Sequence, residues 1–201
     1  MKFFPDSLRL FVLKRLYELT GLISAFIGIF IFVSIISHSP YDPNINNLNN
    51  SEIENLGGAI GANVSNVLLQ LFGNFSLLIC PVLVSWAYKI FFLKELKFFA
   101  LNIFLLPLMI ITLSILSELI QFPSANGFIA ELFFQFLLNQ SLLENNFIYY
   151  GLVFLSFVLF LVFFYGSMGL DTREWSNIYG LFVYVFNYLI KNKFVIPNLN
   201  K

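Results

Sequence analysis

Lysine and arginine are missing from two long stretches of this chain, roughly residues 38–66 and 121–146. Loops that carry Lys and Arg resist transfer across a membrane and stay on the cytoplasmic side. The distribution therefore predicts that the two cation-free stretches lie outside the membrane, that both chain ends lie in the cytoplasm, and that the spans are even in number. The eleven cations form three groups: Lys2, Arg9, Lys14 and Arg15; Lys89, Lys94 and Lys97; Arg173, Lys191, Lys193 and Lys201.

Charge of either sign is scarce. Only 11% of the 201 residues are charged, whereas 59% are hydrophobic and 27 are phenylalanine. A soluble domain is about 25% charged, and one small water-soluble core could not bury this much apolar surface. The composition excludes an ordinary soluble domain. The formal net charge of zero says nothing about partners.

The residues that most chemistry needs are also rare. Cys80 is the single cysteine, which excludes an internal disulfide, and His38 is the single histidine, which excludes a histidine-based metal cluster or catalytic triad. No Gly-Lys pair occurs, so a P-loop is missing. The basic residues are too few and too scattered for a nucleic-acid surface. We expect no catalytic, metal-binding or cofactor-binding residue in this chain, and no enzyme.

Four apolar runs predict an all-α, polytopic membrane protein. The expected spans are 20–37, 67–93, 98–120 and 147–168, which form a transmembrane domain over 20–168 after a cytoplasmic N-terminus at 1–19. The second run is long enough to tilt, with Gly73 and Pro81 as sites of a kink. Lys89 is expected to reach the headgroups, and a tight turn at 94–97 predicts an antiparallel hairpin.

Two amphipathic helices are expected outside the spans. Residues 121–146 contain a helical stripe that predicts an outer helix, either flat on the surface or packed over the bundle. Residues 169–201 are expected to hold an interfacial helix on the cytoplasmic face, followed by the start of a linker. The two apolar stripes are Phe128, Ile129, Leu132, Phe133, Phe136 and Leu137, and Ile178, Leu181, Phe182, Val185, Phe186 and Leu189.

Small residues mark one face of the first span. Gly21, Ser24, Ala25 and Gly28 form small-xxx-small pairs, which permit close approach of a second helix. Glu118 lies near the outer end of the third span, and its position favours headgroup depth over an ion path.

The first outer connection carries the most specific pattern. Directly after the first span comes the stretch Ser39-Pro40-Tyr41-Asp42-Pro43. Its Pro-x-Asp-Pro pattern predicts a sharp end to the helix, because proline does not fit inside a helix. Asn55-Leu56-Gly57-Gly58-Ala59-Ile60-Gly61-Ala62 then leads to Leu69-Gln70-Leu71-Phe72-Gly73. The glycines allow a turn and a close backbone approach before the next helix.

In this order and between these spans, the motifs resemble the N-terminal four-span region of the FtsK/SpoIIIE family of bacterial DNA translocases. The resemblance extends over about residues 15–190. It departs at Ser65-Asn66, where the family often has Ala-Asp, which puts a role for a charge there in doubt.

The resemblance implies a membrane anchor and assembly module at the division septum of the bacterial inner membrane. Such a module would be in contact with lipid, would form a homo-oligomer (a hexamer in the family) and would bind other division proteins. DNA, ATP and magnesium would be bound only by a motor domain C-terminal to this chain, which serves chromosome segregation. The alternative function, a small transporter or channel subunit, would need polar groups at mid-membrane depth or paired broken helices.

Overall fold

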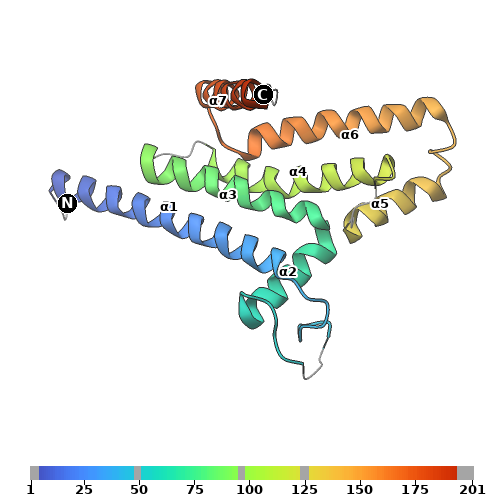
Figure 1. Cartoon of the computed structure of the whole chain (residues 1–201), viewed down its shortest axis with the longest axis horizontal. Helices are drawn as coiled ribbons and strands as arrows, with labels where there is room; N and C mark the ends of the chain where they lie inside the picture. Colours follow the sequence, from blue (N-terminus) through green and yellow to red (C-terminus); the bar gives the residue numbers. More distant parts are fainter. Residues whose placement is uncertain (1–4, 48–50, 95–97, 123–126, 194–201) are drawn as a thin grey trace, which may run out of the picture. The chain divides into compact units, whose positions relative to one another are not determined.

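The computed structural model describes residues 5–47, 51–94, 98–122 and 127–193, and most of them are helical (Figure 1). The α-helices are α1 (Asp6–Ile36), α2 (Gly58–Phe72), α3 (Ile79–Tyr88), α4 (Phe99–Leu119), α5 (Phe128–Asn139), α6 (Asn146–Ser167) and α7 (Thr172–Lys193). A 3-10 helix, η1 (Asn74–Leu78), precedes α3, and a π-helix, η2 (Lys89–Leu93), follows it. Residues 95–97 of the predicted turn and the predicted linker at 198–201 lie outside the described residues.

The chain divides into two compact units, Met1–Gly169 and Leu170–Lys201. Four helical segments of the described residues, all in the first unit, are long and apolar enough to cross a membrane: Ser7–Ile36, Asn74–Leu93, Phe99–Leu119 and Asn146–Ser167. An all-α chain with four spans is therefore what the sequence predicted and what the structure contains.

The second span begins later than the sequence predicted. We expected one helix over 67–93 with a kink at Gly73, but α2 ends at Phe72 and the spanning segment starts at Asn74. Gly73 adopts φ 66° and ψ −159°, outside the helical region, so the helix stops completely there. Pro81 causes no kink because it lies in the first turn of α3, where its missing N–H costs nothing. Helix α2 consequently turns away from α3 (Figure 1).

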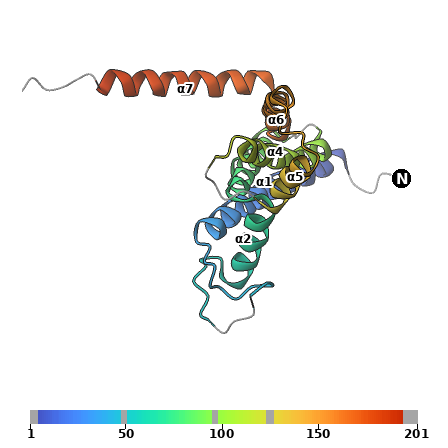
Figure 2. The same ribbon diagram turned by 90° about the vertical axis from the view of Figure 1, so that its right-hand side faces the viewer.

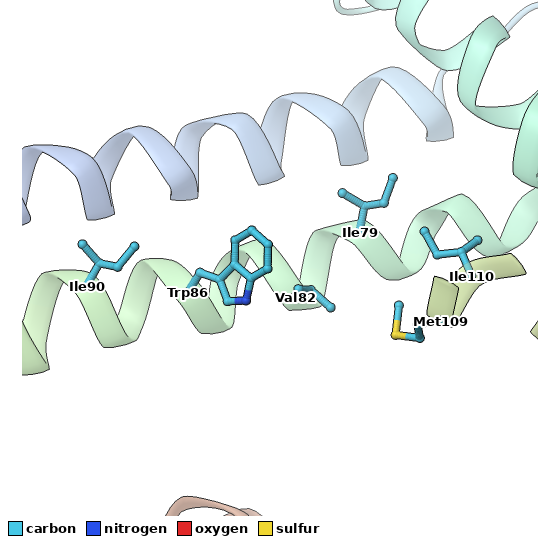
Figure 3. Close-up of a cluster of buried hydrophobic side chains, with 6 residues drawn as sticks. All are labelled: Ile79, Val82, Trp86, Ile90, Met109 and Ile110. Carbon is cyan, nitrogen blue, oxygen red and sulfur yellow. The ribbon is translucent and has the colours of Figure 1, made fainter. Parts of the chain in front are cut away.

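The core lies where α3 faces α4 and α6 (Figure 3). Trp86 of α3 donates its indole N–H to the carbonyl oxygen of Ser167 over 2.7 Å, and the Ser85 hydroxyl donates to the carbonyl oxygen of Met168 over 2.8 Å. These bonds fasten the middle of the second span to the end of the fourth. The buried apolar side chains of this cluster are Ile79, Val82, Trp86, Ile90, Met109 and Ile110.

Helix α6 shows how the bilayer replaces water as the surrounding solvent. Its buried residues are Ser156 and Ser167, whereas large side chains such as Phe154 and Leu155 are exposed. Lipid tails are as apolar as Leu, so packing favours small residues that let helices approach closely and leaves the large ones facing lipid.

Lys89 contradicts a second expectation. Its side chain does not reach outward to the headgroups, because the residue is only 1% exposed. Lys89 begins the π-helix η2, one turn after Trp86, and its side chain lies inside the bundle.

Helix α5 packs against α4 and α2 and does not lie free on the surface. Its buried residues are Gly127, Ala130 and Leu137, while Phe128, Leu132 and Phe136 of the predicted stripe are exposed. The contacts are made by the small residues Gly127 and Ala130 at the start of α5 and by Leu137 near its end, while the exposed aromatic residues point away from the protein.

Helix α7 belongs to the second unit and is amphipathic as predicted. Its 22 residues are not among the four span candidates. The stripe residues Ile178, Leu181 and Phe182 are exposed within their unit.

In the first unit, the connections that lack Lys and Arg lie at one end and the cations Arg15 and Lys94 lie at the other. The 37–57 loop, α2, α5 and the start of α6 gather at one end in Figure 1, and Figure 2 shows the loop and α2 projecting from the bundle there. At the other end, Lys94 and Arg15 bond Glu18 at 2.9 and 2.5 Å. Helix α1 extends fourteen residues N-terminal of the predicted span, and this ion cluster lies at the predicted boundary.

Close contact between α1 and α3 makes a testable prediction about Gly21. A Cβ added there would lie 2.8 Å from both the Cβ and the backbone nitrogen of Phe91, so Gly21→Ala should destabilise the protein by about 1–3 kcal/mol. Gly151→Ala is the matched control, because an added Cβ meets nothing within 4 Å and alanine favours helix by up to about 1 kcal/mol. Thermal unfolding in detergent should show a lower Tm for Gly21→Ala only; equal Tm values would contradict the contact.

Candidate functional site

The first outer connection folds around a buried carboxylate. Asp42 is 1% exposed, and its two oxygens accept the backbone N–H groups of Glu54 at 2.8 Å and Asn55 at 3.0 Å. The backbone N–H of Asp42 in turn donates to the carbonyl oxygen of Ser39 at 3.2 Å. Asp42 therefore joins the two halves of the loop, and its charge is solvated by backbone donors in place of water.

Asn55 extends this arrangement to the end of α1. Its amide nitrogen donates to the carbonyl oxygens of Ser34 at 2.8 Å and Ser37 at 3.3 Å. Those carbonyls belong to the last turn of the helix, which leaves them without helical partners. Asn55 is thus a side-chain cap supplied from a distant part of the sequence. Its amide oxygen accepts the backbone N–H of Gly57 at 2.9 Å.

A third layer joins the loop to α2. Asn44 accepts the amide N–H of Asn66 at 3.2 Å, and Asn66 accepts the amide N–H of Gln70 at 2.9 Å. Asn46 then donates to the Gln70 oxygen at 2.8 Å. His38 lies 3.1 Å from the hydroxyl of buried Ser65, from Nδ1 to Oγ. We call the set the outer-loop network: Ser34, Ser37, His38, Asp42, Asn44, Asn46, Asn55, Ser65, Asn66 and Gln70.

Two glycines let the network close. A Cβ on Gly57 would lie 2.7 Å from the Ser34 hydroxyl oxygen, and one on Gly61 would lie 2.9 Å from the same atom and closer still to Asn55 Oδ1. Both positions therefore need the absence of a side chain. Gly58 has open space around it but a φ of +63°, so glycine there serves backbone conformation and not packing.

The structure brings most of the predicted motif residues together. Ser39 and Ala62 are buried, Pro43 is half-buried and Pro40 is exposed, with its carbonyl oxygen 3.4 Å from the Asn47 amide nitrogen. Gly73 does not join them. It lies beyond the far end of α2, 15 residues or about 22 Å long.

The predicted packing face of the first span lies against α3. The Ser24 hydroxyl donates to the carbonyl oxygen of Leu83 at 3.1 Å, and a Cβ on Gly28 would lie 3.2 Å from that of Leu83. Gly21 approaches Phe91, and Ala25 lines a groove between the two helices. Glu118 is half-buried near the end of α4.

Sequence reasoning missed Ser34, Asn44 and Ser65 as partners in the network. Serine near the end of a membrane helix is too common to be noticed, and the Asn-rich loop was interpreted only as turn chemistry. The one usable signal was the pair Ser65-Asn66, where polar residues follow the glycine motif in an otherwise apolar helix.

The polar groups of the network are used to hold the loop together. Both Asp42 oxygens are occupied by backbone donors, and the described residues contain no group of three or more His, Cys, Asp or Glu that could hold a metal. Around this fixed frame, Tyr41, Ile45 and Leu56 are 76%, 73% and 79% exposed. The geometry therefore presents apolar side chains on a fixed loop.

Four helical segments long and apolar enough to cross a membrane define a polytopic helical membrane domain. Its sequence matches the family described as the 4TM region of DNA translocase FtsK/SpoIIIE over residues 13–136. The chain therefore belongs to the FtsK/SpoIIIE family, as its four-span membrane region. The match extends from α1 into α5 and contains the whole outer-loop network.

A curated relative agrees with this assignment. The chain is 30% identical over 97 residues to a protein named DNA translocase FtsK from Azospirillum brasilense. The alignment covers 47% of this chain and 15% of that relative. No solved structure matches the chain.

Removing the Asp42 charge should loosen the loop. Asp42→Asn replaces one acceptor oxygen by a donor facing a backbone N–H, so hydrogen exchange at the Glu54 and Asn55 amides should accelerate at least about tenfold. Glu52→Gln, an exposed change in the same loop, should leave those rates unaltered. Exchange followed by mass spectrometry on the detergent-solubilised protein measures both, and unchanged protection in Asp42→Asn would refute the role given to the carboxylate.

Proposed function

We propose that this chain is the membrane-anchoring and assembly module of a cell-division DNA translocase. It holds the cytoplasmic ATP-driven DNA pump at the septum of the inner membrane during chromosome segregation. The family membership carries this proposal, and the four spans supply the anchor. The chain itself does no catalysis: ATP, magnesium and DNA are bound by the motor domain of the family.

The proposed orientation places both termini in the cytoplasm. Lys and Arg are lacking in both connections at the loop end of the bundle, whereas the cations Arg15 and Lys94 lie at the opposite end. Since cationic segments stay inside, the outer-loop network faces the periplasm. The motor then hangs from the end where α7 follows the last span.

The outer-loop network is the proposed surface for other division proteins. An apolar side chain held on a fixed backbone loses little conformational entropy on binding. Tyr41 and Ile45 are such side chains, because Asp42 and Asn44, which lie between them in the chain, are buried and hydrogen-bonded. We further propose that copies of the chain assemble around the hexameric motor of the family.

A transporter or channel is not supported by the same features. Among the described residues of the spans, buried hydroxyls such as Thr112 and Ser114 donate to helix carbonyl oxygens and not toward a polar passage. Buried Lys89 lies near the Lys94 end of the bundle and not at mid-span.

The orientation can be checked with single cysteines in a Cys80→Ser background. Ile45→Cys and Glu144→Cys should react with a membrane-impermeant maleimide added to intact spheroplasts, because both belong to cation-free connections. Lys14→Cys should react only after permeabilisation, since it lies on the cationic side. The reverse pattern would overturn the topology while leaving the family assignment intact.

Recruitment can be checked with a fluorescent protein fused to the C-terminus. The fusion should concentrate at the septum, and Tyr41→Ser with Ile45→Ser should spread it evenly over the membrane without lowering its amount there. Tyr150→Ser, an equally exposed aromatic change at the start of α6, is the control that should stay septal. An even distribution of the unaltered fusion would contradict the proposal, and solute flux in proteoliposomes would favour a transporter.

A further inference from the structure

A groove of about 360 Å³ runs between α1 and the α3–η2 segment. It lies toward the end that carries Glu18 and Lys94, away from the outer-loop network. Helix α1 contributes Gly21, Leu22 and Ala25, and the second span contributes Val84, Ala87, Tyr88, Phe91 and Phe92. On the second span these residues cover eight steps of helix, or about 12 Å.

The sequence explains why a groove forms here. The two helices touch at Gly21, where a Cβ would lie 3.0 Å from the carbonyl oxygen of Ala87. Beside that contact, the short side chains of Ala25 and Ala87 leave space, while Tyr88 and Phe92 stand out from the helix and are exposed. The result is a narrow apolar channel with aromatic walls that opens toward the surroundings of the spans.

Cations lie at the mouth of this groove. Glu18 precedes Gly21 by one helical turn, and it bonds Lys94 Nζ at 2.9 Å and Arg15 Nη1 at 2.5 Å. Lys14 is one turn before Glu18 on the same side of α1 and is exposed. Among the described residues, three cations and one carboxylate therefore leave two positive charges next to the apolar groove.

We propose that this groove binds one anionic phospholipid, with an acyl chain in the channel and the phosphate beside Lys14, Arg15 and Lys94. The charge pattern matches such a lipid. Its anionic headgroup would meet the cations at the mouth, and its acyl chain would lie in the apolar channel. The inference needs only the membrane-spanning class of the chain and is independent of the proposed role at the septum.

The charge at the mouth of the groove favours a lipid over a helix from a second copy. An acyl chain is only one methylene wide and can follow the apolar groove for the roughly 12 Å over which the second span lines it. The phosphate of the same lipid supplies the negative charge that the cations at the mouth require.

Native mass spectrometry of the whole chain in a non-ionic detergent tests the site with two probes, dioleoyl phosphatidylglycerol and dioleoyl phosphatidylcholine. Phosphatidylglycerol should be retained about tenfold more strongly, given two uncompensated charges near the phosphate. Val84→Trp should abolish its retention by filling the channel. Val162→Trp is the matched control, because Val84 and Val162 are both exposed on spanning helices, at 52% and 57%.

The headgroup contact is tested separately. Lys14→Gln with Arg15→Gln should remove the preference for phosphatidylglycerol, whereas Arg9→Gln, an equally exposed cation farther along α1, should keep it. Circular dichroism confirms that each variant remains helical, and Ala25→Leu, which fills the channel from α1, replaces Val84→Trp if that variant does not fold.

Four results would overturn the proposal. The first is equal retention of the two lipids, and the second is retention of phosphatidylglycerol by both channel-filling variants. The third is an oligomer that Val84→Trp dissociates while no lipid is retained, which would make the groove a contact between copies. The fourth is that Arg9→Gln also loses the preference for phosphatidylglycerol over phosphatidylcholine. The preference would then come from general surface charge and not from a headgroup site.

Discussion

Close approach of helices through small residues is the constraint on which this structure depends. In lipid, burying a large apolar side chain brings little advantage over leaving it in the bilayer, so helices are held by tight contacts and a few polar bonds. Gly21 and Gly28 let α1 lie against the second span, and the Ser24 hydroxyl bonds across the same contact. Trp86 does the equivalent work between α3 and the end of α6.

The sequence predicted which segments are helical better than it predicted which side chains of those helices are buried. Four apolar runs separated by polar segments predicted the spans and the all-α class, because the thickness of a bilayer sets their length. The prediction was wrong about Lys89, whose side chain is buried and does not reach outward, and the sequence left open whether α5 lies flat or packs over the bundle, which the contacts with α4 and α2 decide. It also could not show that Gly73 ends a helix, because φ is a property of the fold and glycine tolerates many values.

For the outer-loop network, the motif located the loop but not its partners. Asp42 and Asn55 stood out from their neighbours in the chain, yet the bonds that join the two halves of the loop to each other and to α1 link residues 12 to 21 apart. Pairings at that separation need the folded backbone. The departure at Ser65-Asn66 now has a physical account: Asn66 donates to Asn44 and accepts from Gln70, and a carboxylate at that position could not donate.

Helix α2 joins the outer loop to the spans as a stiff strut. Its N-terminal end is bound into the network at Gly57, and its middle through Ser65 and Asn66. At the other end, the carbonyl oxygen of Phe72 accepts the Ser114 hydroxyl of α4 at 3.1 Å, and Gly127 of α5 rests on the backbone of Leu71. A helix resists compression along its hydrogen-bonded axis, so a push on the loop reaches α4 and α5 with little loss. A load on this loop is thereby carried to the third span through protein contacts and not through lipid.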